Sequence, residues 1–168
     1  MLSFLLPDMW VDAVENIDLF QLQSQGIVSL IVDVDNTLTP HHQQTVSEAK
    51  SKWIAQAKSM GFSITLLSNN HPKRIAVVSQ SIDCHGIGFA AKPFSRHYRR
   101  IVKSKHLNQS SVAVIGDQLF TDIAGGKIRG YFSIYVEPIS KRDIMYSRFS
   151  RVLERWVIAQ FRKKGWLL

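Results

Sequence analysis

Residues 31–40 read IVDVDNTLTP and follow the apolar stretch IVSL at residues 27–30. Two carboxylates, Asp33 and Asp35, therefore stand one residue apart, directly after a run of the kind that forms a buried strand. Burial penalises an ionised carboxylate, and two like charges this close raise each other's pKa unless a cation lies between them. The stretch therefore predicts that a cation binds at the end of a buried strand.

Short apolar segments recur along the chain and alternate with helical segments. Runs without polar alternation are typical of strands that are buried on both faces. The five predicted strands lie at residues 27–32, 63–68, 88–91, 112–116 and 132–136. The predicted helices between them lie at residues 46–60, 71–81 and 95–106. This alternation predicts an α/β fold of three layers, in which helices cover both faces of a mainly parallel, five-stranded sheet.

The length and composition indicate a single unit. The chain has 168 residues, of which 45% are hydrophobic and 20% are charged, so one domain over residues 1–168 is expected. Residues 1–26 are expected to form an N-terminal extension that packs on the core. Residues 141–168 carry eight Lys or Arg against Asp143 and Glu154, and we expect them to form a basic amphipathic helix. Such a helix attracts phospholipid headgroups, nucleic acid or an acidic partner.

The chain shows the features of a cytoplasmic protein. Cys84 is the single cysteine, so no disulfide forms within the chain and a reducing compartment fits. The opening MLSFLLPDMW has no basic segment, and Pro7 and Asp8 interrupt its apolar run, so no signal peptide is expected. No stretch approaches the roughly 20 apolar residues of a membrane-spanning helix. A peripheral position on an anionic membrane, through the basic C-terminal helix, is a further hypothesis.

Polar residues follow four of the predicted strands, at the point where each strand ends. Ligands of open α/β sheets bind beyond the carboxyl ends of the strands, so these residues are expected to meet at one edge. The four polar stretches are DVDNT at 33–37, SNN at 68–70, KP at 92–93 and GDQLFTD at 116–122. This concentration of polar groups predicts a functional site.

The residue types at this edge suit phosphoryl chemistry. Asp117 and Asp122 add carboxylates to the first pair, and an oxygen-only site with a substrate phosphate suits Mg²⁺. The hydroxyls of Thr37 and Ser68 can donate to phosphate oxygens, and Lys92 can offset the charge of a transferring phosphoryl group. One Asp can act as a nucleophile while another moves protons. The sequence therefore predicts a metal-assisted phosphatase.

The motifs DVDNT, SNN, AKP and GDQLFTD resemble motifs one to four of the haloacid dehalogenase (HAD) superfamily of phosphatases, in the order and on the elements that this family uses. Within the superfamily, SNN, AKPF, residues 116–140 and the opening FLLP are similar to the small bacterial YqeG-like branch, which is related to phosphatidylglycerophosphate phosphatases. The resemblance covers nearly the whole chain and implies a HAD-like, Rossmannoid fold.

The resemblance also implies a role for each candidate residue. Asp33 is expected to be the nucleophile that forms an aspartyl phosphate, and Asp35 the general acid and base. Lys92 is expected to stabilise both the nucleophile and the phosphoryl group. The expected phosphate-binding residues are Thr37, Ser68 and Asn69. The expected Mg²⁺ ligands are Asp33, the backbone carbonyl of Asp35, Asp117 and Asp122, the last as a ligand or as an outer carboxylate.

The spacing of the motifs leaves no room for a cap domain. Only 30 residues (38–67) separate the first motif threonine from the serine of the second, and only 21 (71–91) separate that motif from the lysine. Such an open site resembles family members that act on bulky or lipid-linked phosphates, or that close the site as homo-oligomers. Phosphatidylglycerophosphate is the leading expected substrate. The alternatives are a nucleic-acid end, a phosphoprotein, a small phosphometabolite, or a binding module without turnover.

Several neighbouring residues have simpler interpretations. His41 and His42 lack a matching third ligand, which favours a solvated loop over a metal site. Asn70 is expected to cap the helix that follows it. No basic platform with interleaved aromatic residues is found, which disfavours nucleic acid as a partner. The stretch TPHHQQ at 39–44 is where substrate choice is expected to lie.

Overall fold

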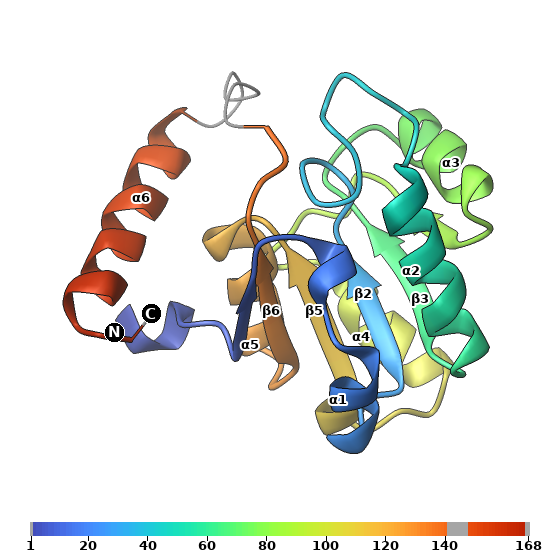
Figure 1. The fold of residues 1–168 in the computed structure, drawn as a ribbon, viewed down its shortest axis with the longest axis horizontal. Helices are drawn as coiled ribbons and strands as arrows, with labels where there is room; N and C mark the ends of the chain where they lie inside the picture. Colours follow the sequence, from blue (N-terminus) through green and yellow to red (C-terminus); the bar gives the residue numbers. More distant parts are fainter. Residues whose placement is uncertain (1, 141–147, 167–168) are drawn as a thin grey trace.

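A six-stranded sheet forms the centre of the computed structural model, which describes residues 2–140 and 148–166 (Figure 1). The strand order is β1-β6-β5-β2-β3-β4, and every pair of neighbours is parallel. The strands are β1 (Met9–Val11), β2 (Ser29–Val32), β3 (Ser63–Leu67), β4 (His85–Ile87), β5 (Val112–Gly116) and β6 (Phe132–Val136). The predicted class, an α/β fold with a parallel sheet between helices, is confirmed.

Two details of the predicted sheet were wrong. The strand predicted at residues 88–91 does not form, because β4 ends at Ile87. Phe89 and Ala91 have φ values of 47° and 58°, a left-handed conformation in which a strand cannot continue. The sheet also has six strands rather than five, because β1 adds to the edge of β6. This strand has only three residues, all half-buried, so its sequence shows no pattern of alternating apolar and polar residues from which a strand could be predicted.

Helices cover both faces of the sheet because consecutive residues of β2 bury on opposite sides. Leu30 and Val32 pack in the same cluster as Trp53 of α2, whereas Ile31 packs in the same cluster as Tyr98 of α4. In Figure 1, α1 and α2 lie before the sheet, and α4 and α5 lie behind it. The helices are α1 (Leu19–Ser24), α2 (Glu48–Ser59), α3 (Pro72–Ser81), α4 (Arg96–Ser104), α5 (Ala124–Lys127) and α6 (Arg148–Lys163). Shorter turns are η1 (Leu2–Leu5), η2 (Val14–Asn16), η3 (Gln109–Ser111) and η4 (Leu119–Ile123).

Side chains cap the helices that begin at the carboxyl edge of the sheet. The Ser95 hydroxyl accepts a hydrogen bond from the backbone N–H of His97 at the start of α4. At the start of α3, Nδ1 of His71 accepts from the backbone N–H of Lys73. The prediction that Asn70 caps α3 was therefore wrong. His71 takes the cap position, which leaves the Asn70 side chain for another contact described below.

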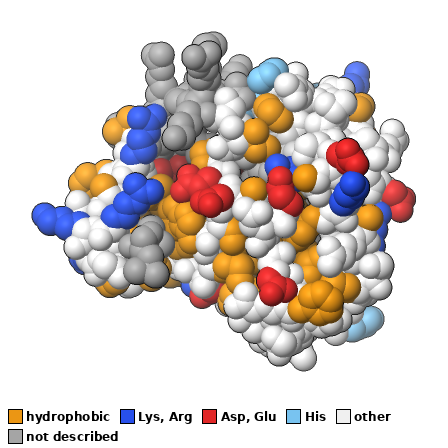
Figure 2. Space-filling model, in the orientation of Figure 1, with side chains coloured by type: hydrophobic (Ala, Val, Ile, Leu, Met, Phe, Trp, Pro, Cys, Tyr) orange, Lys and Arg blue, Asp and Glu red, His pale blue; other side chains and the backbone are white. Residues whose placement is uncertain are grey.

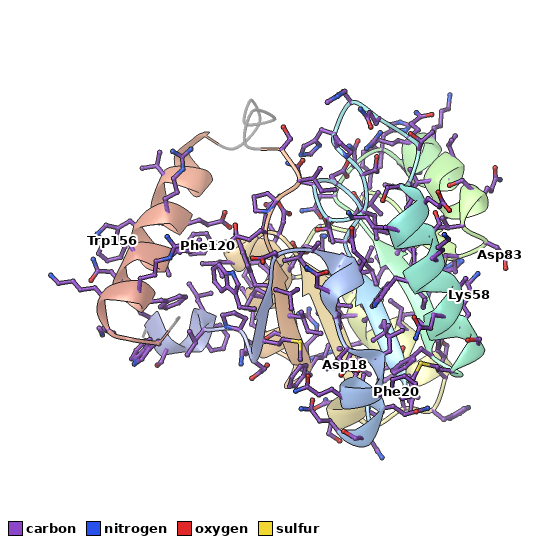
Figure 3. The ribbon with its side chains drawn as sticks, in the orientation of Figure 1. Asp18, Phe20, Lys58, Asp83, Phe120 and Trp156 are labelled. Atoms are coloured by element: carbon purple, nitrogen blue, oxygen red, sulfur yellow. The ribbon has the colours of Figure 1, made fainter. Side chains whose placement is uncertain are left out.

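The two ends of the chain pack on the central sheet. Val14 and Leu22, from the region of the expected N-terminal extension, are buried in the main core. At the other end, α6 packs through Val157 and Phe161, while Trp156 is 52% exposed and points away from the sheet (Figure 3). Lys and Arg side chains gather over α6 on the face shown in Figure 2. Residues 141–147 and 167–168 of the expected basic helix lie outside the described residues.

None of the helices described at residues 2–140 and 148–166 combines the length and the apolar character that crossing a membrane requires.

We predict that Asp8→Ala lowers the free energy of unfolding by about 1–3 kcal/mol, because Asp8 joins the segment before β1 to β6 and α5. Its carboxylate accepts from the N–H and hydroxyl of Ser133 at 2.8 and 2.7 Å, and from Nζ of Lys127 at 2.6 Å. Burial raises the pKa of Asp8, but the bonds from Lys127 and Ser133 outweigh burial and hold the pKa below its ordinary value.

The stabilising effect of Asp8 is therefore present at neutral pH and lost as the pH falls through the lowered pKa. Urea unfolding measured from pH 7 to about pH 2 should show the difference between variant and wild type shrink once the pH falls below the ordinary Asp value of 3.8. Asp12→Ala is the control, because Asp12 is exposed and makes no side-chain hydrogen bond among the described residues. Equal loss of stability in the two variants would contradict the prediction.

Candidate active site

The site lies where the winding of the sheet changes direction. From β2 the chain adds β3 and β4 on one side, and β5 and β6 on the other. Val32 of β2 is in register with Ile115 of β5, and the N–H of Asp33 donates to the Ile115 carbonyl at 2.8 Å. Residues that follow β2 and β5 therefore enter the same crevice, which is the usual ligand position in open α/β sheets.

Three carboxylates converge in this crevice. Asp33, Asp117 and Asp122 are all buried, and each offers an oxygen within 4.8 Å of the others. Asp122 reaches the cluster because η4, a π-helical turn, follows β5 directly. A Cβ atom at Gly116 would overlap the Asp122 carboxyl group, so glycine is required where β5 ends. The predicted carboxylate cluster is thus assembled from two neighbouring strand ends.

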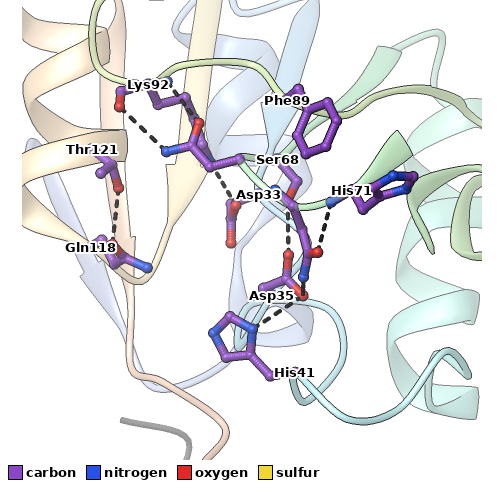
Figure 4. A pocket seen from close by; sticks show the side chains of 11 residues that line it. Asp33, Asp35, His41, Ser68, His71, Phe89, Lys92, Gln118 and Thr121 are labelled. Atoms are coloured by element: carbon purple, nitrogen blue, oxygen red, sulfur yellow. Dashed lines mark hydrogen bonds and ion pairs between the residues drawn. The ribbon is translucent and has the colours of Figure 1, made fainter. Parts of the chain in front are cut away.

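Lys92 lies inside the carboxylate cluster. Its Nζ is 2.5 Å from Oδ1 of Asp33 (Figure 4). The same Nζ is 2.7 Å from Oδ1 of Asp122. The Asn69 side chain binds the backbone of Lys92. Its Oδ1 accepts from the Lys92 N–H at 2.7 Å, and its Nδ2 donates to the Lys92 carbonyl at 3.3 Å. The predicted phosphate-binding residue Asn69 thus fixes the backbone of the predicted catalytic lysine.

Burial and charge change the pKa values of this cluster in predictable directions. The pKa of Asp33 is raised well above its usual range, mainly because the carboxyl group is buried. The charge of Lys92 lowers this pKa, but the charges of the other three aspartates, Asp122, Asp117 and Asp35, raise it. Burial alone would lower the pKa of Lys92, but Asp122 and Asp33 outweigh burial and raise it, so the ammonium stays charged at neutral pH. Added positive charge in the cluster would favour the ionised forms of its carboxylates.

Asp35 has different partners from those of Asp33. The Ser68 hydroxyl donates to its Oδ2 at 2.8 Å, and Nδ2 of Asn70 donates to its Oδ1 at 3.2 Å. Nε of Arg74 donates to the same Oδ1 at 2.9 Å. Because Ser68 follows β3 and Arg74 belongs to α3, the second carboxylate lies beside these two elements, and the chain turns directly after it at Asn36, which has a φ of 63°. Two aspartates that are one residue apart therefore enter separate environments.

Five of the predicted site residues line one cavity of about 560 Å³, whereas Asp117 and Asp122 are not among its lining residues. Asp33, Asp35, Ser68, Asn69 and Lys92 all line it (Figure 4). The cavity opens beside His41, whose Nδ1 lies 3.5 Å from Oδ1 of Asp35. His41 therefore faces the site, although the sequence favoured a solvated loop.

Thr37 is completely buried after the Asp35 turn and is not among the cavity-lining residues. Its Oγ1 atom has no hydrogen-bond partner among the described residues, so its hydroxyl is available for a further contact.

Sequence reasoning missed Arg74, which joins Asp35 to the loop over the cavity. Besides its bond to Asp35, its guanidinium donates to the carbonyls of Pro40 at 2.9 Å and Gln43 at 2.5 Å. The residue stands in the first turn of α3, where its sequence context, HPKRIAVV, resembles an ordinary exposed helix start. The cavity-lining residues that were also missed are His71, Phe89, Gln118 and Thr121.

The carboxylate cluster fits a divalent cation. Oδ2 of Asp33 is buried and has no hydrogen-bond partner among the described residues, so this atom is available to a cation or a ligand. Three buried carboxylates form the oxygen-only donor set that hard divalent ions prefer. The side chain of Asp35 lies outside this cluster, so its predicted role as a ligand depends on its backbone carbonyl.

Comparisons with known proteins agree with this geometry. Residues 2–92 match the family model of mitochondrial PGP phosphatases, and residues 89–138 match a HAD-hydrolase-like model. The probable phosphatase YqeG of Bacillus subtilis (strain 168) is 32% identical over 97% of this chain and 95% of its own length. The chain therefore belongs to the HAD-like hydrolases. Within them it is a HAD-type phosphatase of the YqeG branch.

Other relatives are more distant. A phosphatidylglycerophosphate phosphatase of Arabidopsis thaliana is 24% identical over 97% of this chain, which spans 50% of that protein's length. Among solved structures, a cobalt-bound deoxy-D-mannose-octulosonate 8-phosphate phosphatase of Haemophilus influenzae has a TM-score of 0.54 at 12% identity, over 67% of this chain and 69% of that one. The similarity to the Haemophilus influenzae structure supports the fold only.

We predict that Arg74→Leu lowers kcat for an aryl phosphate by about tenfold to 100-fold, because small displacements of catalytic groups are costly. The variant removes the guanidinium that orients Asp35 and the loop at residues 40–43. Because Arg74 acts through Asp35, the double variant Asp35→Asn, Arg74→Leu should be little worse than Asp35→Asn alone. Additive losses in steady-state kinetics of the double-mutant cycle would show that Arg74 has an independent role.

We predict that Gly116→Ala weakens binding of a divalent cation at least about tenfold, because the new methyl group displaces the Asp122 carboxylate by roughly an ångström or more. Mn²⁺ binding measured by electron paramagnetic resonance reports this without turnover. Asp122→Asn should weaken binding too, since it removes a charge and keeps the volume of the side chain. Wild-type affinity in both variants would exclude Asp122 from the cation site.

Proposed function

We propose that this protein is a Mg²⁺-dependent phosphomonoesterase that works through an aspartyl phosphate on Asp33. The observation that carries the proposal is the placement of two aspartates with different partners at one cavity. Asp33 lies against the ammonium of Lys92, whereas Asp35 lies among the hydrogen-bond donors Ser68, Asn70 and Arg74. A site that separates two carboxylates in this way can give them separate roles.

In the first step, a carboxylate oxygen of Asp33 attacks the phosphorus atom and forms a new O–P bond. The bond from phosphorus to the leaving-group oxygen breaks, and Asp35 gives that oxygen a proton. Lys92 holds the other Asp33 oxygen at 2.5 Å and supplies positive charge beside the phosphoryl group. Ser68, which lines the same cavity, is the proposed donor to a phosphate oxygen, and the buried hydroxyl of Thr37 is a second one.

In the second step, water attacks the phosphorus of the aspartyl phosphate and releases Asp33. Asp35, deprotonated by the first step, takes the proton of that water, so protons balance over one cycle. Its bonds from Asn70 and Arg74 fix its carboxylate at the cavity through both steps, while the single Ser68 hydrogen turns from Asp35 to the phosphate. The catalytic residues of this proposal are Asp33, Asp35 and Lys92.

We propose Asp33, the Asp35 carbonyl and Asp117 as ligands of Mg²⁺, with Asp122 as a further ligand or an outer carboxylate. Bound there, Mg²⁺ would neutralise charge on the phosphoryl oxygens and on the carboxylates. The buried cluster and the oxygen-only donor set support this choice.

The proposed substrate is a bulky or lipid-linked phosphomonoester such as phosphatidylglycerophosphate. Two findings support it: the match to PGP phosphatases over residues 2–92, and a cavity formed on loops with no inserted domain between the motifs. We further propose that residues 1–168 act as one domain in the cytoplasm. Contact of α6 with an anionic membrane and closure of the site by a second copy remain proposals.

The decisive test is Asp33→Asn, which should abolish hydrolysis of p-nitrophenyl phosphate and of phosphatidylglycerophosphate in detergent micelles. The amide cannot form the phosphoenzyme, so rates should fall by at least about 10³-fold. Wild-type enzyme incubated with labelled substrate and quenched in acid should carry label that Asp33→Asn lacks. Chelation of divalent ions should also abolish the activity, and Mg²⁺ should restore it.

Asp83→Asn is the matched control, because its carboxylate lies on the surface, far from the cavity. It should retain full activity. Undiminished hydrolysis by Asp33→Asn would exclude the proposed nucleophile, and hydrolysis of the aryl phosphate alone would exclude the proposed lipid substrate.

A further inference from the structure

Two exposed phenyl rings flank the catalytic lysine. The side chains of Phe89 and Phe94 are 61% and 78% exposed, and Lys92 lies between them in sequence. This segment follows β4 at the carboxyl end of the sheet, the same end at which the cavity opens. Phe89 lines the cavity itself (Figure 4). Apolar surface is therefore concentrated beside the opening of the site.

The protein holds this segment in place. The N–H of Phe89 donates to the Asn70 carbonyl at 2.8 Å. The guanidinium of Arg129 donates to the carbonyls of Pro93 at 2.9 Å and Ser95 at 3.0 Å. These bonds fix the backbone on both sides of Lys92, so the exposure of the rings is built into the fold. Exposed apolar rings favour contact with an apolar phase.

The helix that follows presents only positive charge to solvent. Arg96, Arg99, Arg100 and Lys103 are exposed and stand at offsets of 3, 4 and 7, on one face of α4. None of the four pairs with a carboxylate in the described part of the chain. The face spans about 10 Å along the axis, close to one Debye length at physiological salt. We call these four residues the α4 basic face.

The cavity cannot shelter acyl chains. Among the described residues that line it, Phe89 is the one apolar side chain, and the rest are acidic, basic, amide, hydroxyl or imidazole groups. If the substrate is lipid-linked, as proposed above, its chains must stay in the bilayer while the phosphate enters the cavity. The opening of the cavity would then have to face the headgroups directly.

We propose that Phe94 and the α4 basic face form a docking surface for an anionic phospholipid bilayer, which brings the cavity to the headgroups. This inference depends on the proposed lipid-linked substrate for its purpose, but it predicts a binding event that needs no turnover. The ring inserts among the acyl chains, and the four cations contact anionic headgroups. The surface is separate from α6, the helix that the sequence had suggested for membrane contact.

The experiment is co-sedimentation of the full chain with vesicles of equal parts phosphatidylglycerol and phosphatidylcholine. Phe94→Ser should lower the partition coefficient about tenfold, because it removes an insertable ring. Phe94→Leu should retain most of the binding, since it keeps an apolar side chain. Phe20→Ser is the matched control: Phe20 is 67% exposed, but it lies on α1, toward the opposite end of the sheet (Figure 3).

Two double variants, each of which removes two positive charges, complete the test. Arg99→Gln, Arg100→Gln should weaken binding about tenfold or more and should reduce the preference over pure phosphatidylcholine vesicles. Arg155→Gln, Arg162→Gln removes the same charge from α6 and should have a smaller effect. Loss of binding with the α6 pair and not with the α4 pair would overturn the proposal, as would tighter binding to a single-stranded oligonucleotide than to the vesicles.

Failure of this inference can be told apart from failure of the proposed function. Phe94→Ser should hydrolyse p-nitrophenyl phosphate at the wild-type rate, because its ring does not line the cavity. Its loss should appear only with phosphatidylglycerophosphate presented in vesicles. Absence of vesicle binding by active wild-type enzyme overturns the docking surface and leaves the phosphatase intact. Vesicle binding by an enzyme inactive on every phosphate overturns the function instead.

Discussion

The structure depends on the burial of three carboxylates, Asp33, Asp117 and Asp122, around one ammonium group. Removing each ion from water costs several kcal/mol, and the attraction to Lys92 repays this only where the geometry is tight. Neighbouring parallel strands supply that geometry, because β2 and β5 end side by side. The fold thus brings together carboxylates that repel one another, and a bound cation would relieve that repulsion.

The two aspartates after β2 have different environments because different neighbouring elements supply their partners. Asp33 lies in the cluster against Lys92, whereas Asp35 lies beside the end of β3 and the start of α3, just before Asn36 turns the chain with its positive φ. There Asp35 accepts hydrogen bonds from Ser68 and Arg74 and lies outside the carboxylate cluster. The separation of these two carboxylates is therefore a property of the partners that surround each of them.

The sequence predicted the centre of the molecule better than its edges. Strands with long apolar runs and the polar residues after them were predicted correctly, because a buried parallel strand admits few other sequences. The edge strand β1 was missed, since its three residues are only half-buried. Arg74 was missed because a contact across 39 positions leaves no local pattern. Asn70 was assigned as a cap from its type, but His71 takes that place and frees the amide for Asp35.

The failed strand prediction at residues 88–91 also explains how the site relates to the surface. Had those residues continued β4, Phe89 would have packed as a strand residue and Lys92 would have left the sheet further from Asp33. Left-handed conformations at Phe89 and Ala91 end the pairing instead, and the side chains of Phe89 and Lys92 both line the cavity. The turns that bring Lys92 within 2.5 Å of Asp33 are therefore the turns that leave the neighbouring rings exposed. The position of Lys92 and the exposure of the neighbouring rings are linked through a single short segment of backbone.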